Sequence, residues 1–182
     1  PAEARAALVG AAVGTLAWFL PGIVGGGDPI AQRTLLGAGT LALLPVVFLV
    51  RFALGSLSYS AGTPGGLFAP LLVLGAQFGL FFGLACQLAF PGLNIQPEGF
   101  AVVGMAALFT GIVRAPLTGI VLATEMTDNV TLLLPMLGAC AMAMLTPTLM
   151  HDPPIYDSLR ERTVNRERAR LDRVARAARE RE

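Results

Sequence analysis

The stretch Thr63-Pro64-Gly65-Gly66-Leu67-Phe68-Ala69-Pro70 precedes a charge-free apolar run that continues to Phe90. Its first proline and its glycines disfavour the continuation of a preceding helix. Pro70 lacks an N–H group and is tolerated only in the first turn of a new helix. We therefore expect a helix to begin near Leu67 and to end before Pro91-Gly92.

The start of this predicted helix has no acidic side chain nearby, because no Asp or Glu lies between Arg51 and Glu98. The first N–H groups of a helix lack intrahelical partners and carry the positive end of the helix dipole. Flanking glycines allow another group to approach the backbone closely. Two interpretations follow. The helix start binds an anion, or it belongs to a broken membrane helix whose N–H groups bond to carbonyls or water.

The composition is that of a membrane protein. Hydrophobic residues make up 54% of the 182 residues, charged residues 14%, and the mean hydropathy is +0.67. A soluble domain carries about a quarter charged residues. Residues 99–113, 115–124 and 129–151 contain no Asp, Glu, Lys or Arg, and such runs cross or nearly cross ~30 Å of hydrocarbon. The sequence therefore predicts an all-α integral membrane protein that crosses the bilayer several times.

Proline and glycine divide the chain into helical segments, several of them too short for a full span at ~1.5 Å per residue. Short successive segments are typical of the broken or re-entrant helices that transporters place at the membrane midplane. The expected segments are 4–24, 29–37, 40–57, 67–90, 99–113, 116–127 and 130–150, followed by a weakly amphipathic helix in the tail.

Glycines at a spacing of four predict two close helix contacts. Gly75, Gly79 and Gly83 share one face of the central helix, where a second helix can approach backbone to backbone. Gly10 and Gly14 predict a similar contact for the first helix.

Three polar features of the apolar region need partners. Arg51 must snorkel, pair, or face protein interior or water. Glu125 and Asp128 are expected to bond to nearby backbone or to Arg114, in preference to a proton-relay role. A polar group before the central helix either lines a wet cavity or caps helix ends, and consists of Ser56, Ser58, Tyr59, Ser60 and Thr63.

The C-terminal tail differs in character from the rest of the chain, and we divide the chain into 1–158 and 159–182. Residues 160–182 contain nine arginines and five acidic residues, a net charge of +4. Basic residues next to a span favour the cytoplasmic side. The interspersed acids argue against binding to nucleic acid.

Four stretches resemble the CLC family of chloride channels and chloride/proton antiporters, in the family's order. They are Gly65-Gly66-Leu67-Phe68-Ala69-Pro70, which resembles the Gly-x-Phe-x-Pro anion-site motif, residues 105–125 (MAALFTGIVRAPLTGIVLATE), Met126-Thr127-Asp128-Asn129 and Pro154-Ile155-Tyr156. Two other anion-loop motifs of the family, Gly-Ser-Gly-Ile-Pro and Gly-Arg-Glu-Gly-Pro, do not occur in this sequence.

The resemblance implies a CLC-type inverted-repeat helical bundle, of which this chain represents the C-terminal half. It implies that Gly66 and the backbone N–H groups of Leu67 and Phe68 hold a chloride or similar small anion. The Tyr156 hydroxyl would donate to the anion from the cytoplasmic side, although an interfacial aromatic anchor is the alternative for this residue. Channel and proton-coupled antiporter both remain open, because the gating glutamate belongs to a missing motif.

The family resemblance also implies a homodimer in the inner membrane of a bacterial cell. The subunit contact would come from residues 116–127 and 130–150, whose apolar faces suit lipid contact equally well. We expect no cofactor apart from the transported chloride, and no enzymatic activity, because motifs such as His-Glu-x-x-His and Gly-x-Ser-x-Gly are absent from the sequence. The alternative function is a membrane scaffold or subunit without transport activity of its own.

Overall fold

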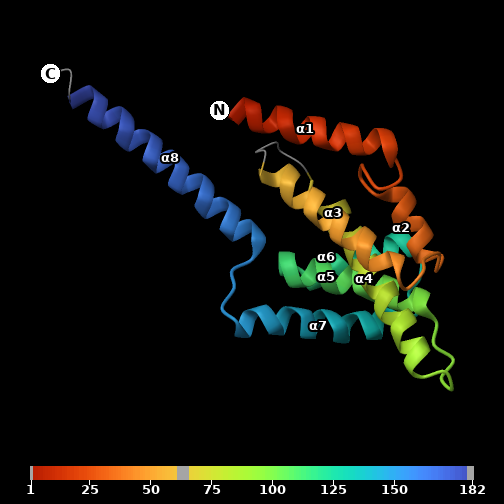
Figure 1. Cartoon of the computed structure of the whole chain (residues 1–182). Coiled ribbons are helices and arrows are strands. Elements are labelled where there is room, and N and C mark those ends of the chain that lie inside the picture. The colour runs from red at the N-terminus through yellow and green to blue at the C-terminus, as the bar shows by residue number, and fades with distance from the viewer. Residues whose placement is uncertain (1, 61–65, 180–182) are drawn as a thin grey trace.

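The computed structural model describes residues 2–60 and 66–179, which form eight α-helices and no strand (Figure 1). Thr63, Pro64 and Gly65 of the opening stretch therefore lie outside the described residues. The helices are α1 (Ala2–Phe19), α2 (Asp28–Leu35), α3 (Leu43–Ser60), α4 (Phe68–Ala89), α5 (Pro97–Val113), α6 (Pro116–Thr127), α7 (Leu133–Leu149) and α8 (Ile155–Arg179).

The boundaries of α4 agree with the prediction from its flanking residues. The helix begins at Phe68 with Leu67 as its N-cap, and Pro70 lies within the first turn. At the other end, the Phe90 N–H donates to the Cys86 carbonyl at 2.9 Å. Pro91 then prevents continuation, since it has no N–H group. Among the described helices, α4 alone is long and apolar enough to cross a membrane, and α3, α5, α7 and most of α1 are shorter apolar helices.

The centre of the fold is the close pair of α4 and α5, and the glycine stripe is what permits it. A Cβ added at Gly75 would meet the Gly104 carbonyl oxygen at 2.5 Å, and one added at Gly79 would collide with the Phe100 carbonyl oxygen. Gly83 faces the Pro97 Cα in the same way. The predicted backbone-to-backbone contact is therefore confirmed, and α5 is the partner helix.

The core extends from this pair across α5 to α6 and α7. Phe109, Met105 and Leu80 are fully buried, as are Met136 and Cys140 of α7. Burial of each such side chain contributes about 1.5–3 kcal/mol relative to exposure. The core thus fixes α4, α5, α6 and α7 relative to one another.

The two ends of the chain are less enclosed. A Cβ at Gly10 or Gly14 would meet nothing within 4 Å, so the contact predicted for these glycines does not form among the described residues. At the other end, α8 extends away from the other helices (Figure 1) and continues through position 158 without a break.

Candidate anion site

A cavity of about 600 Å³ lies where five helices and one loop meet. Its wall combines residues of α1, the loop after α1, α3, the first turns of α4, the end of α5 and the first turn of α8. Most of the lining is apolar. Gly66 and Leu67, at the start of α4, are part of it, as are Ser56, Ser58 and Tyr59 of the predicted polar group. Two further members of that group lie outside the described part of the structure: the side chain of Ser60 and the whole of Thr63.

The N-terminus of α4 opens into this cavity without a side-chain cap. Leu67 makes no capping hydrogen bond, and the first turn contains no acidic residue. Among the described residues, no carbonyl accepts from the N–H groups of Leu67 and Phe68. The positive end of the helix dipole is therefore not neutralised by this part of the chain.

The Phe68 side chain takes no part in the cavity wall. Its ring packs against that of Phe109, with centroids 5.2 Å apart and planes tilted by 39°. This aromatic contact anchors the first turn of α4 to the centre of α5. Phe68 can therefore serve the site through its backbone while its side chain holds the turn in place.

Tyr156 lies beside the cavity, near Tyr59. The phenol groups of the two tyrosines are close enough to interact electrostatically. Tyr156 itself is not among the lining residues, but Ile155 and Leu159, which flank it on α8, are. The structure thus brings Gly66, Leu67 and the neighbours of Tyr156 to one cavity, although they are far apart in the sequence.

Among the described residues that line the cavity, Arg51 is the only charged one, and it is only 7% exposed. Its Nη1 donates to the Ile23 carbonyl at 2.8 Å and its Nη2 to the Gly25 carbonyl at 3.3 Å. Its Nε is buried and unpartnered among the described residues. Gly27, in the left-handed conformation with φ 96°, leaves room for the guanidinium, since a Cβ there would collide with Nη2. Of the three predicted options for Arg51, the structure has it facing the protein interior.

Of the two partners expected for Glu125 and Asp128, nearby backbone or Arg114, the pairing with Arg114 is not found among the described residues. The Arg114 guanidinium donates instead to groups at the end of α7 and in the following linker. Asp128 is the C-cap of α6, with φ 50°. A guanidinium beside a helix C-terminus also interacts favourably with the negative end of the helix dipole. These acceptors cannot be identified from the local sequence, because every residue has a main-chain carbonyl.

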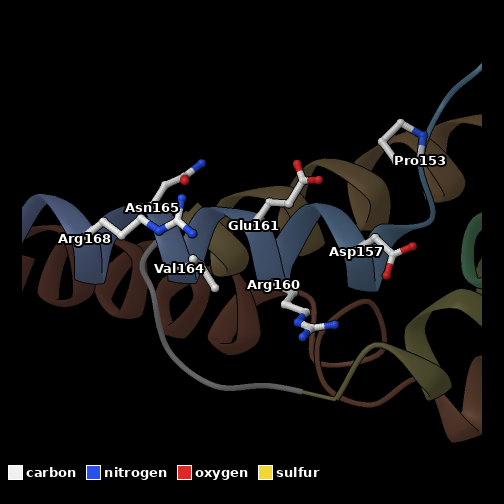
Figure 2. A pocket seen from close by; sticks show the side chains of 7 residues that line it. All are labelled: Pro153, Asp157, Arg160, Glu161, Val164, Asn165 and Arg168. Atoms are coloured by element: carbon white, nitrogen blue, oxygen red, sulfur yellow. The ribbon is translucent and has the colours of Figure 1, made fainter.

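A second hollow of about 520 Å³ runs along α8 and is lined by Pro153, Asp157, Arg160, Glu161, Val164, Asn165 and Arg168 (Figure 2). Apart from Pro153, all of these residues belong to one helix. The two arginines are matched by two carboxylates on the same surface. Among the described side chains, this hollow therefore lacks the unopposed positive charge that distinguishes the first cavity.

Sequence reasoning did not assign Arg51 or the loop at Ile23 and Gly25 to the site. The charge-free surroundings of Arg51 were a usable signal, because an isolated arginine in an apolar helix needs buried acceptors. Its acceptors could not be found from the sequence, since they are main-chain groups of a glycine-rich loop.

Comparison with known proteins gives one consistent result. The family described as "Voltage gated chloride channel" matches residues 1–148. The chain is 38% identical over 163 residues to the H(+)/Cl(-) exchange transporter ClcA of Vibrio parahaemolyticus, covering 90% of this chain and 35% of the relative. It is 41% identical over 169 residues to ClcA of Yersinia pestis bv. Antiqua, covering 92% and 35%.

Solved structures agree with the sequence comparison. The chain matches the crystal structure of a slow cyanobacterial Cl-/H+ antiporter with a TM-score of 0.81 and 35% identity, over 87% of this chain and 37% of that one. The chain thus spans about a third of the length of these relatives. Its helices adopt the CLC fold, and the protein belongs to the voltage-gated chloride channel (CLC) family of membrane proteins.

Proposed function

We propose that this chain forms the part of a chloride transporter in which the N-terminus of α4 holds the permeating anion. The observation that carries the proposal is the uncapped start of α4 at a cavity where the only charged residue among the described lining is a cation. Gly66, Leu67 and Phe68 present backbone N–H groups to the anion, and Tyr156 donates its hydroxyl. Neutral donors offset the lost hydration of chloride without binding so tightly that the ion cannot leave.

The names of the relatives favour exchange of chloride for protons over a passive channel, because they are H(+)/Cl(-) exchange transporters. These names support chloride transport and do not support the alternative of a membrane scaffold without transport activity. They also describe transporters, with no enzymatic step in their names. The protein needs no cofactor in this proposal, as chloride is its substrate.

The test uses the intact full-length protein, with crystals soaked in bromide and chloride binding measured by calorimetry. We expect anomalous density near the backbone of residues 66–68. Tyr156→Phe should weaken chloride binding by about 1.5–3 kcal/mol, the value of a hydrogen bond to a charged group, with less loss where water replaces the hydroxyl. Absence of bromide density at α4 would refute the site, and an unaltered affinity and flux in Tyr156→Ala would refute the role of Tyr156.

We further propose a homodimer whose subunits meet through α6 and α7. These helices expose large apolar side chains, including Leu117, Val121, Leu134 and Met142. The same surface suits lipid, so the two possibilities need a direct test. Cysteines placed along residues 132–142 of the intact protein in membranes should give intersubunit crosslinks, and their complete absence would favour lipid contact.

The remaining proposals concern location and organisation. The protein would reside in the inner membrane of a bacterial cell, as a multi-pass protein with its basic tail in the cytoplasm. Residues 1–158 form the transmembrane part, and residues 159–182 form a cytoplasmic extension in which α8 carries the positive charge.

A further inference from the structure

Arg114 lies between α5 and α6, and its guanidinium joins this junction to the end of α7. Nη1 donates to the Thr148 hydroxyl at 2.7 Å and to the Met144 carbonyl at 3.2 Å. Nη2 donates to the Asp152 carbonyl at 2.8 Å, in the linker between α7 and α8. One side chain thus fixes two turns of α7 and the linker that leads to Tyr156.

The backbone of Arg114 is itself held in place. Its φ of 64° lies in the left-handed region, and its N–H donates to the Thr110 carbonyl at 2.8 Å. A non-glycine residue persists in that conformation only where its surroundings determine it. Pro116 then begins α6 within two residues. The guanidinium therefore extends from a fixed point at the end of α5.

The linker between α7 and α8 connects Asp152 to Tyr156 through a restricted backbone. The Asp152 N–H donates to the Pro147 carbonyl of α7 at 3.0 Å, and its carbonyl accepts from Arg114, so both main-chain groups of Asp152 are bonded. Pro153 and Pro154 follow directly, and proline fixes its own φ and restricts the residue before it. Tyr156 is the second residue of α8. α8 packs on the bundle chiefly through α5, and Tyr59 of α3 is a further neighbour of this turn.

We propose that Arg114 is a positioning residue for Tyr156, setting where its hydroxyl lies beside the anion cavity. The proposal rests on the proposed function, in which Tyr156 donates to the anion. The simpler alternative is that Arg114 only attaches α7 to the end of α5. The two differ in one respect: a positioning residue affects anion binding only while the Tyr156 hydroxyl is present.

A double-mutant cycle separates these possibilities, because residues that act through one another are not additive. Chloride affinity is measured by calorimetry on the full-length protein and its Arg114→Gln, Tyr156→Phe and doubly substituted forms. We expect Arg114→Gln alone to weaken binding about two- to tenfold, a part of the loss expected for one hydrogen bond to an anion. In the Tyr156→Phe background its effect should fall below about twofold.

Thr148→Val offers a milder variant should Arg114→Gln fold poorly, and α7 supplies its matched control. The Thr148 hydroxyl accepts from Arg114 and donates to the Met144 carbonyl at 2.7 Å. The Thr146 hydroxyl makes only the second kind of bond, to the Met142 carbonyl at 3.1 Å, and both threonines are exposed. Thr148→Val should weaken chloride binding in the same direction as Arg114→Gln, and Thr146→Val should not.

A second measurement reports the position of Tyr156 without relying on chloride. 3-Fluorotyrosine is incorporated at position 156 of the full-length protein, and its ¹⁹F resonance is recorded. Arg114→Gln should shift or broaden this resonance, whereas Thr146→Val should leave it in place. A resonance unchanged by Arg114→Gln overturns the proposal.

The affinity results complete the test. The proposal is also overturned if Tyr156→Phe weakens binding while Arg114→Gln has no effect, or the same effect in both backgrounds. A third outcome is that Arg114→Gln shifts the resonance while Tyr156→Phe leaves the chloride affinity unaltered. This outcome supports the positioning role of Arg114 and refutes the anion-binding role of Tyr156. Failure of the inference and failure of the proposed function are thus distinguishable.

Discussion

The Nη1 group of Arg51 donates to the Ile23 carbonyl across 2.8 Å, joining α3 to the loop between α1 and α2. The second bond, from Nη2 to Gly25, strengthens the same link. These carbonyl partners each accept from one of the two terminal nitrogens of the guanidinium but do not cancel its charge. Arg51 therefore has two separable effects: its hydrogen bonds fix a loop, and its positive charge acts on the cavity that the start of α4 also lines.

Substitution of Arg51 by Lys or Gln separates these effects. A cavity of about 600 Å³ is about 10 Å across, and a unit charge at that distance contributes roughly 1.7 kcal/mol at an effective dielectric constant of about 20. We expect Arg51→Gln to weaken chloride binding about tenfold and Arg51→Lys to weaken it much less. Calorimetry on the intact protein provides the measurement. Equal losses in the two variants would show that loop geometry, and not charge, accounts for the effect.

Gly79→Ala tests the contact between α4 and α5. The added methyl group would meet the Phe100 carbonyl and the Ala101 Cα, which are backbone atoms that cannot move aside separately. Overpacking of this kind costs about 1–3 kcal/mol, so thermal unfolding in detergent should occur at a lower temperature. Gly10→Ala is the control, since its Cβ would meet nothing within 4 Å and alanine favours the helix. Equal behaviour of both variants would contradict the close packing at Gly79.

The sequence predicted the helices well where proline and glycine mark their ends. Pro91, Pro97 and Pro116 act on their immediate neighbours, so a local rule suffices to locate the boundaries. The glycine stripe of α4 likewise predicted a close contact, but not that α5 supplies it. Identifying the partner helix requires the tertiary fold, because the stripe only removes a steric barrier.

The predictions that depended on side-chain partners were less successful. Glu125 and Asp128 were expected to bond to nearby backbone or to Arg114, yet Arg114 donates to the Met144 and Asp152 carbonyls, which lie 30 and 38 positions further along the chain. Main-chain acceptors carry no sequence signature, as every residue has a carbonyl. Gly10 and Gly14 have the spacing of a contact face, but spacing alone does not bring a second helix to them.

The side of the membrane on which α8 lies can be tested by cysteine labelling. Asn165 is exposed and belongs to α8, so Asn165→Cys offers an accessible thiol once Cys86 and Cys140 are replaced. The arginines next to the last span predict a cytoplasmic tail. An impermeant reagent should therefore label this position only after the cells are permeabilised. Labelling of intact cells would place the tail outside.

Gln77 of α4 provides a test of the core itself. The side chain is only 1% exposed, and neither Nε2 nor Oε1 has a hydrogen-bond partner among the described residues. A buried amide left unsatisfied costs about 1–3 kcal/mol. Methionine has a similar unbranched shape and no such requirement. We therefore expect Gln77→Met to raise the temperature of thermal unfolding in detergent.

Gln87→Met is the matched control for Gln77→Met, because it makes the same exchange on the same helix. Gln87 is exposed, and its Nε2 donates to the Ile95 carbonyl at 3.3 Å. Loss of such a bond should lower stability by about 0.5–1.5 kcal/mol. The two variants should thus move the unfolding temperature in opposite directions. If Gln77→Met is the more destabilising of the two, the buried amide has a partner, and an ordered water bonded to it would be the first candidate to seek.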